Sequence, residues 1–301
     1  MAERSLEVHM ARILAIGGVT LDLIFTVAHY PDEDAELRAK GLRICPGGNA
    51  ANTLVVLSQL GHACAFGGVL ADDSEATPII DHLVRHRIDL TACRYVRGRP
   101  PTSCVLLSLE GGTRTIVHHR ELPEYGDDDF RRIDLTPFDW VHFEGRDASE
   151  ATRMVRRVRE SCPGLPCSVE VEKPRPGIEA IFADATVLIF SRAYAGHLGF
   201  DVPRPFLSTI REQAPQADLI VTWGKEGAYG LDRQGEIQHS PAYPPIEIKD
   251  TLGAGDTFNA GLIDAYLKGR GLAEALSHAC RLAGTKCGQI GLEGLQWPRT
   301  L

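Results

Sequence analysis

The sequence predicts an α/β fold in which helices cover a mostly parallel central sheet. Short apolar segments alternate with helical patterns along most of the chain, which is the order typical of parallel sheets. The first of these segments, residues 12–18, ends in glycine, as expected for a strand buried on both faces. With 44% hydrophobic and 24% charged residues, the 301-residue chain can also build a large core. We therefore expect one domain, residues 1–301, with a small lid.

The alternation is interrupted after the first strand. Residues 21–25 and 36–40 do not lead directly into a helix, so they are interpreted as a lid of extra strands. A helix is predicted over residues 49–61, because Asn49 is a suitable cap, the apolar residues have helical spacing and a glycine closes the segment. The next predicted elements are a strand over residues 64–70, a helix over 74–87 and a β-hairpin of 103–109 and 113–118.

The second half of the chain alternates more regularly and ends in two long helices. This pattern favours a parallel sheet and places the helical end in the same domain. The lid would combine the interrupted segment with the hairpin, over about residues 20–45 and 95–120. The predicted strands cover residues 140–143, 168–171, 187–190 and 218–222, and the predicted helices cover residues 148–160, 254–268 and 272–286.

Composition argues against several classes of partner. The formal net charge is −8 and the arginines are scattered, so the chain lacks the basic stripe of a nucleic-acid-binding protein. No apolar run reaches the roughly 18 residues of a membrane helix, and residues 1–12 lack the apolar core of a signal peptide. The eight cysteines include no CxxC pair, which indicates free thiols in a reducing compartment. We expect a cytoplasmic protein that binds neither nucleic acid nor membrane.

The strongest chemical signal is the glycine-rich segment 250–261 at the start of a predicted helix. Free amides of Gly253, Ala254 and Gly255 would face an anion, which the helix dipole also favours. Asp256 is unexpected there, because a phosphate repels a carboxylate. It is explained if Asp256 accepts the proton of a hydroxyl that attacks the phosphate. The alternative is that Asp256 only caps the helix.

A second group of polar residues joins Asp22, just after the first strand, to the start of the helix predicted at 49. Asn49 and Asn52 are three residues apart and can share one face of that helix. Amides and a carboxylate together offer donors and acceptors, which suits a polyhydroxylated sugar. The alternative is that Asn49 caps the helix and Asn52 is solvated.

These motifs make the chain similar to the ribokinase-like carbohydrate kinases, and the similarity runs from end to end. The family signature is residues 250–260, supported by Leu21-Asp22 and by residues 47–52. Residues 143–150 and 168–175 resemble the branch of this family that phosphorylates ketohexoses. The resemblance implies a three-layer α/β sandwich with a β lid and an ATP-dependent kinase, most of all one that converts D-fructose to fructose 1-phosphate. The alternatives are a kinase for another sugar, a modified ketose or a nucleoside, and a silent sugar or nucleotide sensor.

The resemblance also assigns roles to individual residues. It implies that Asp256 is the base acting on the 1-hydroxyl and that Gly253, Ala254 and Gly255 form the anion hole. For Cys287, plain helix packing is the alternative. The ketose would contact Asp22, Gly48, Asn49 and Asn52, whereas ATP would contact Arg114, Gly224, Lys225, Glu226 and Gly227, with its adenine near Tyr243, Pro244, Pro245, Ala283, Gly284 and Cys287.

The chain departs from the family pattern at the metal. Many members carry an Asn-x-x-Glu motif that organises Mg²⁺, whereas residues 191–194 read Ser-Arg-Ala-Tyr here, so no metal ligand is assigned. Lys225 also stands where the animal ketohexose kinases usually have an acidic residue. Mg²⁺-ATP is still expected, and the need for K⁺ stays open.

Charged residues that follow two predicted strands leave two interpretations open. Glu144, Arg146 and Lys173 would lie at the carboxyl edge of the sheet, where the cations could neutralise a triphosphate. The alternative is a structural ion pair among these residues and Glu172. Finally, the lid is expected to form the contact of a homodimer, from which Asp34 would reach the partner's site.

Overall fold

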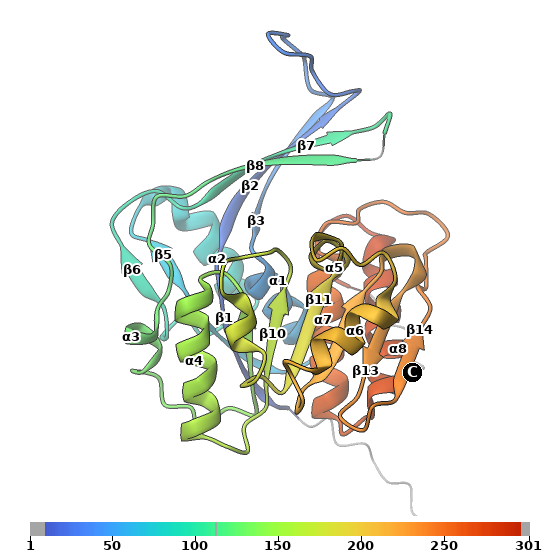
Figure 1. Cartoon of the computed structure of the whole chain (residues 1–301). Coiled ribbons are helices and arrows are strands. Elements are labelled where there is room, and N and C mark those ends of the chain that lie inside the picture. The colour runs from blue at the N-terminus through green and yellow to red at the C-terminus, as the bar shows by residue number, and fades with distance from the viewer. Residues whose placement is uncertain (1–9, 112, 296–301) are drawn as a thin grey trace, which may run out of the picture.

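The central sheet is built from eight strands, and the computed structural model describes residues 10–111 and 113–295. In spatial order the strands are β14 (Ile237–Ser240), β13 (Ala228–Leu231), β12 (Asp218–Thr222), β11 (Val187–Ser191), β10 (Cys167–Val171), β9 (Trp140–Glu144), β1 (Arg12–Ile16) and β4 (Ala63–Gly67). From β12 to β4 every pair is parallel, and β13 and β14 continue the sheet antiparallel (Figure 1). The predicted mostly parallel sheet is therefore confirmed.

Helices cover both faces of this sheet and complete three layers. Side chains of β1 alternate between the two faces, because Leu14 and Ile16 join one hydrophobic core and Ile13 and Ala15 join the other. The first core is closed by α3 (Asp127–Phe130), α4 (Ala148–Ser161), α5 (Arg192–His197) and α6 (Pro203–Arg211), and the second by α1 (Asn49–Gln59), α2 (Thr77–Arg85), α7 (Ala254–Leu267) and α8 (Leu272–Cys287).

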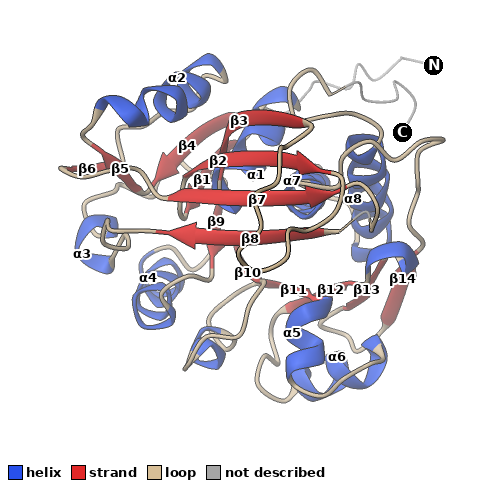
Figure 2. Ribbon diagram, turned by 90° about the horizontal axis from the view of Figure 1, so that it is seen from above, coloured by secondary structure: helices blue, strands red, loops and turns tan. Residues whose placement is uncertain are grey.

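A separate four-stranded sheet stands over the carboxyl ends of the central strands. Its order is β3 (Gly41–Gly47), β2 (Thr20–Val27), β7 (Thr102–Ser108) and β8 (Arg114–His119). Only β2 and β7 pair in parallel among these strands, and seen from above the sheet lies across the central layer (Figure 2). Residues 36–40 contain no strand, contrary to expectation, and β3 begins at Gly41.

The strand predicted over residues 64–70 is divided in two. β4 ends at Gly67, and β5 (Val69–Ala71) leaves the central sheet to pair with β6 (Arg94–Val96). Gly68 permits the change of direction, because a Cβ there would lie 2.7 Å from the carbonyl oxygen of Gly17. The helix predicted from Ser74 likewise begins as a short 3₁₀ turn, and α2 starts at Thr77.

The fold brings distant segments to one edge. In parallel strands the carboxyl ends meet on the same side of the sheet, and ligands of open α/β folds bind there. The N-termini of α1 and α7 lie at this edge beneath the four-stranded sheet, so residues from both halves of the chain face one space (Figures 1 and 2).

Within the described residues no helix is long and apolar enough to cross a membrane.

Candidate active site

A cavity of about 350 Å³ lies between the carboxyl edge of the central sheet and the four-stranded sheet. It is lined by residues of β2, β7 and β8 on one side and by residues of α1, α7 and the central strands on the other. All five residues expected to contact the sugar line it, namely Asp22, Gly48, Asn49, Asn52 and Asp256.

Asp256 lies in the first turn of α7 and is only 7% exposed. Its Oδ2 accepts a hydrogen bond from Asn52 Nδ2 at 2.7 Å, so the carboxylate is directed toward α1. The N-cap residue of α7 is Gly253, and no side chain of the described residues caps this helix. The interpretation of Asp256 as a helix cap is therefore wrong. Burial, reinforced by the charges of Glu144 and Glu172, raises the pKa of Asp256 to about 7, although the bond from Asn52 opposes the shift.

The turn before α7 exposes the backbone of its first residues. Gly253 adopts a left-handed conformation with φ 81°, which glycine tolerates and other residues rarely adopt. A Cβ on Gly255 would meet no described atom within 4 Å, so the backbone of Gly255 faces open space. The first amides of a 14-residue helix therefore adjoin the cavity beside Asp256, an arrangement that attracts an anion.

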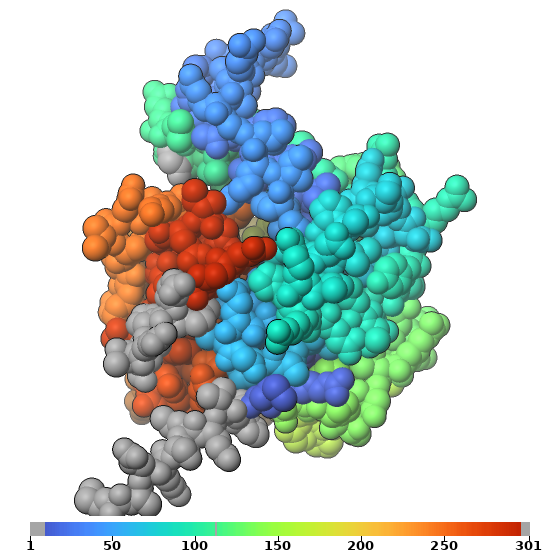
Figure 3. Space-filling model, turned by 180° about the vertical axis from the view of Figure 1, so that it is seen from behind, coloured from blue at the N-terminus to red at the C-terminus, as the bar shows by residue number. Residues whose placement is uncertain are grey.

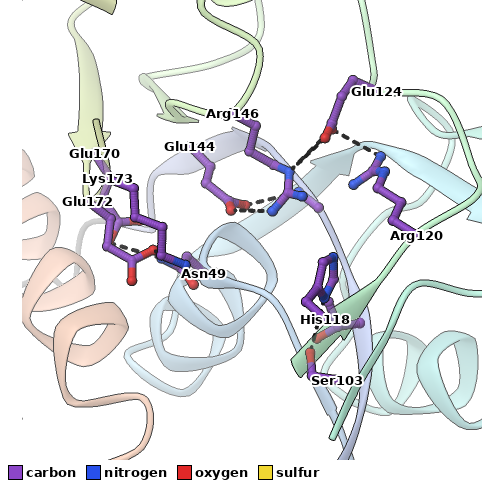
Figure 4. A network of polar contacts seen from close by, with 12 residues as sticks. Asn49, Ser103, His118, Arg120, Glu124, Glu144, Arg146, Glu170, Glu172 and Lys173 are labelled. Carbon is purple, nitrogen blue, oxygen red and sulfur yellow. Dashed lines mark hydrogen bonds and ion pairs between the residues drawn. The ribbon is translucent and has the colours of Figure 1, made fainter. Parts of the chain in front are cut away.

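The start of α1 is held by Gly48. Its φ of 112° and its contact with the carbonyl of Gly18, 2.2 Å from where a Cβ would stand, both require glycine. Asn49 is the first residue of the helix and does not cap it, so that alternative is wrong. Its Nδ2 instead contacts Glu170 Oε1 at 3.2 Å and Glu172 Oε2 at 3.3 Å (Figure 4).

Asp22 approaches the cavity from β2. Thr20 Oγ1 donates a hydrogen bond to Asp22 Oδ1 at 2.8 Å. A Cβ on Gly47 would lie 2.2 Å from Asp22 Oδ2, so glycine at 47 makes room for the carboxylate. These contacts fix the direction of the Asp22 carboxylate, and Asp22 also lines the cavity.

Sequence reasoning missed Glu170 as a site residue. It is buried at the end of β10, and its Oε2 has no hydrogen-bond partner among the described residues. Burial raises the pKa of Glu170 well above its usual range, and the nearby charges of Asp256, Glu144 and Glu172 add to the effect. The available signal was a glutamate inside an otherwise apolar strand.

Asn259, Ser103 and His118 also line the cavity without having been predicted. Asn259 is buried, lies one turn after Asp256, and its Nδ2 has no partner in the described part of the chain. Its signal was the spacing of three residues from Asp256 along the helix. Ser103 Oγ and His118 Nδ1 are 3.2 Å apart on β7 and β8 (Figure 4). These two depend on strand pairing, which the local sequence does not reveal.

Arg146 is held in a network of ion pairs. Its guanidinium contacts Glu144 at 2.9 Å and Glu124 at 3.2 Å, and Arg120 contacts Glu124 at 3.0 Å (Figure 4). Burial alone would lower the pKa of Arg146, but the two glutamates raise it, so the charge is firmly maintained. Lys173 pairs with Glu172 at 3.5 Å. The ion-pair interpretation therefore describes these contacts, although Arg146 and Lys173 also line the cavity.

A second cavity, of about 360 Å³, adjoins the first. A Cβ on Gly284 would lie 1.9 Å from the carbonyl oxygen of Tyr243, so α8 approaches this loop closely only with glycine there. Thr222 and Gly255 line both cavities, which places their junction at the start of α7. The second cavity holds most of the residues expected around ATP, namely Gly224, Lys225, Gly227, Tyr243, Pro244, Pro245, Ala254, Gly255, Ala283, Gly284 and Cys287.

Three residues expected around ATP lie elsewhere. Gly253 lines the first cavity and not the second. Arg114, on β8, lines the first cavity. Glu226 belongs to the short 3₁₀ turn Gly224–Glu226 but does not line either cavity. Cys287, in contrast, lines the second cavity as expected. Burial raises the pKa of its thiol.

The segment at 191–194 has a structural explanation. Ser191 Oγ accepts a hydrogen bond from the amide of Tyr194 at 3.0 Å and caps α5. The guanidinium of Arg192 lies over the ring of Trp223, 5.2 Å from its centroid. Three glutamates, Glu144, Glu170 and Glu172, line the first cavity elsewhere.

Comparison with known proteins agrees with this geometry. Residues 10–298 match the pfkB family carbohydrate kinases. The chain is 39% identical to ketohexokinase of Mus musculus over 293 residues, covering 94% of this chain and 98% of the relative. It is 25% identical to fructosamine kinase FrlD of Bacillus subtilis, covering 96% and 95%.

Solved structures share the fold. A putative ribokinase from Agrobacterium tumefaciens matches with a TM-score of 0.84 at 23% identity, over 95% of this chain and 94% of the other. Ribokinase of Arabidopsis thaliana, complexed with ribose and ATP, matches with a TM-score of 0.79 at 20% identity, over 94% of each chain. The expected three-layer architecture is therefore confirmed.

Proposed function

Since this chain belongs to the pfkB family of carbohydrate kinases, we propose that it transfers the γ-phosphoryl group of ATP to the 1-hydroxyl of a ketohexose, with D-fructose as the preferred substrate. The observation that carries the proposal is the buried carboxylate of Asp256, which lines the first cavity beside the first residues of α7. The 39% identity to a ketohexokinase supports the choice of sugar.

In the proposed reaction, the sugar oxygen attacks the γ-phosphorus, and the bond between that phosphorus and the bridging oxygen breaks to release ADP. Asp256 accepts the proton of the attacking hydroxyl. The amides of Gly253, Ala254 and Gly255 stabilise the charge that develops on the transferred group. Asp22, Gly48, Asn49 and Asn52 hold the other hydroxyl groups, since all line the same cavity.

ATP is proposed to occupy the second cavity. Its wall near Pro244, Pro245 and Ala283 suits a flat apolar base. A Cβ on Gly224 would meet no described atom within 4 Å, so the backbone there is open to phosphates. The γ-phosphate would then reach the junction at Gly255. Lys225 and, from the lid side, Arg114 supply positive charge.

Mg²⁺ is proposed to enter with ATP. Carboxylate oxygens suit a hard cation. Of the three glutamates that line the first cavity, Glu170 has an oxygen, Oε2, with no protein partner in the described residues. When bound, the ion would neutralise charge on the phosphates.

The four-stranded sheet is proposed to act as a lid and as the contact of a homodimer. Leu42, Ile44 and Val117 are each more than half exposed on its strands, which is unfavourable for a free sheet in water. A closed lid would also exclude water from the phosphoryl group. Asp34, in the loop between β2 and β3, would reach the partner's site.

We expect Ile44→Asp to convert the dimer into a monomer, because the charged side chain would be buried in the contact. Light scattering measures the oligomeric state, and a monomeric wild-type protein would contradict the proposal.

The protein is proposed to work in the cytoplasm. All eight cysteines lie in the described part of the chain and are free, a state that a reducing compartment maintains.

Substrate identity is tested by initial rates with fructose, ribose and fructose 6-phosphate, using coupled detection of ADP in Mg²⁺ buffer with and without K⁺. The highest kcat/KM for fructose supports the proposal. A higher value for ribose or the phosphorylated ketose would assign another substrate. Binding without turnover would indicate a sensor.

Asp256→Asn is expected to lower kcat by about 10²–10⁴, the usual contribution of a general base. Because the variant removes a buried charge, its thermal midpoint at pH 8 should not fall. Kinetics and calorimetry measure the two effects. Asp201→Asn, at an exposed position, is the matched control. Near-normal turnover in Asp256→Asn would remove this residue from the role of base.

Asn49→Ala is expected to raise the KM for the sugar more than the KM for ATP. The side chain lines the first cavity and adjoins Glu170 and Glu172 rather than the second cavity. Steady-state kinetics with each substrate varied in turn measure both values. Equal increases would argue against a sugar contact.

The pH dependence should report the raised pKa of Asp256. The base acts when deprotonated, so kcat/KM should rise with pH and level off above about 7. Glu172→Gln removes a charge that raises this pKa, so the acidic limb should move to lower pH. Glu160→Gln, on the exposed end of α4, should leave the profile unchanged. An unshifted profile in Glu172→Gln would contradict the assignment.

A further inference from the structure

Two histidines and a glutamate converge outside the active site. His82 lies in the last turn of α2, and His86 follows four residues later at the end of the helix. Their rings are 4.9 Å apart between centroids. Glu293, in the segment after α8, reaches both: its Oε1 lies 3.4 Å from His82 Nδ1 and 3.8 Å from His86 Nε2. One ligand atom from each residue therefore lies within 4.8 Å of the other two.

The arrangement fits a tetrahedral transition-metal ion. Histidines four residues apart on a helix share one face, the spacing by which helices present two ligands to zinc. At metal–ligand distances of about 2.0–2.1 Å, the vertices of a tetrahedron are about 3.4 Å apart. The two distances to Glu293 are close to this value, so small side-chain rotations suffice. Two imidazoles and one carboxylate favour Zn²⁺ over Mg²⁺, which prefers oxygen ligands.

We propose that His82, His86 and Glu293 form a site for a transition-metal dication of the Zn²⁺ class, with a water molecule as the fourth ligand. Three protein ligands leave one position open, so the ion would exchange with solvent. His82, Arg85 and Glu293 line a cavity of about 370 Å³ that gives an ion room to enter. Arg85 opposes binding by its positive charge. The proposal does not depend on the kinase reaction.

Occupancy would link α2 to the segment that supports the anion-binding turn. Leu292 packs under Gly253, 3.2 Å from where a Cβ would stand. Gln59 Nε2 donates to the carbonyl of Leu292 at 2.9 Å, and the amide of Gly291 donates to Asp250 Oδ2 at 3.1 Å. Seen from behind, the red C-terminal segment reaches the cyan surface that includes α2 (Figure 3). A metal bound to Glu293 would therefore fasten this segment to α2.

The test is a titration of the full-length, tag-free, chelator-treated protein with Zn²⁺, followed by calorimetry. One tight ion per chain and a higher thermal midpoint with zinc are expected. His82→Ala and His86→Ala should each weaken zinc binding by at least about tenfold. Even residues that only hydrogen-bond to a metal ligand change the metal affinity by about 10–100-fold. Arg85→Gln should tighten it. His197→Ala, at an exposed histidine of α5, should leave it unchanged.

Two further measurements keep the result interpretable. Glu293 is 62% exposed in its side chain, so Glu293→Gln tests the site without disturbing the core and should also weaken binding. Co²⁺ in place of Zn²⁺ should give the visible bands of nitrogen and oxygen ligands without a thiolate charge-transfer band. Equal zinc affinity in the wild type and the histidine and glutamate variants, or a thiolate band, would overturn the proposal.

Discussion

The site depends on burying the charge of Asp256 next to a place that attracts phosphate. A carboxylate is costly to bury, and the hydrogen bond from Asn52 at 2.7 Å offsets that cost only in part, because the pKa still rises to about 7. The bond spans 204 positions in the chain and fixes the start of α1 against the start of α7. A carboxylate poised in this way can take up a proton near neutral pH, which a solvated aspartate does poorly.

The rest of the site follows from how closely backbone segments approach each other. Gly48 brings α1 against the loop after β1, and Gly284 brings α8 against Tyr243. Gly253 turns the chain so that the first amides of α7 stay free of side-chain caps. At these positions a Cβ would meet backbone or require an unfavourable φ, so larger residues would move a helix terminus. The two cavities meet at Gly255 because these approaches are made together.

Negative charge is concentrated where the phosphates are proposed to bind. Glu144, Glu170 and Glu172 line the cavity together with Asp256, and the charges of Glu144 and Glu172 raise the pKa of both Asp256 and Glu170, which is unfavourable without a cation. Arg146 relieves Glu144, whereas Glu170 keeps an unpaired oxygen within the described structure. Carboxylates that are only partly paired by protein groups are typical of a site where a bound ligand supplies the compensating positive charge.

The sequence by itself determined the alternation of strands and helices and the glycine-rich start of α7. It also singled out the candidate site residues Asp22, Asn49, Asn52 and Asp256. These are local properties, because periodicity, turn residues and motif spacing act over a few positions. Only the tertiary structure decided that Asn49 contacts Glu170 instead of capping α1, that Gly68 divides a strand, and that His118 faces the cavity. Those outcomes depend on which strands pair and which helices pack together, and such contacts join residues far apart in the chain.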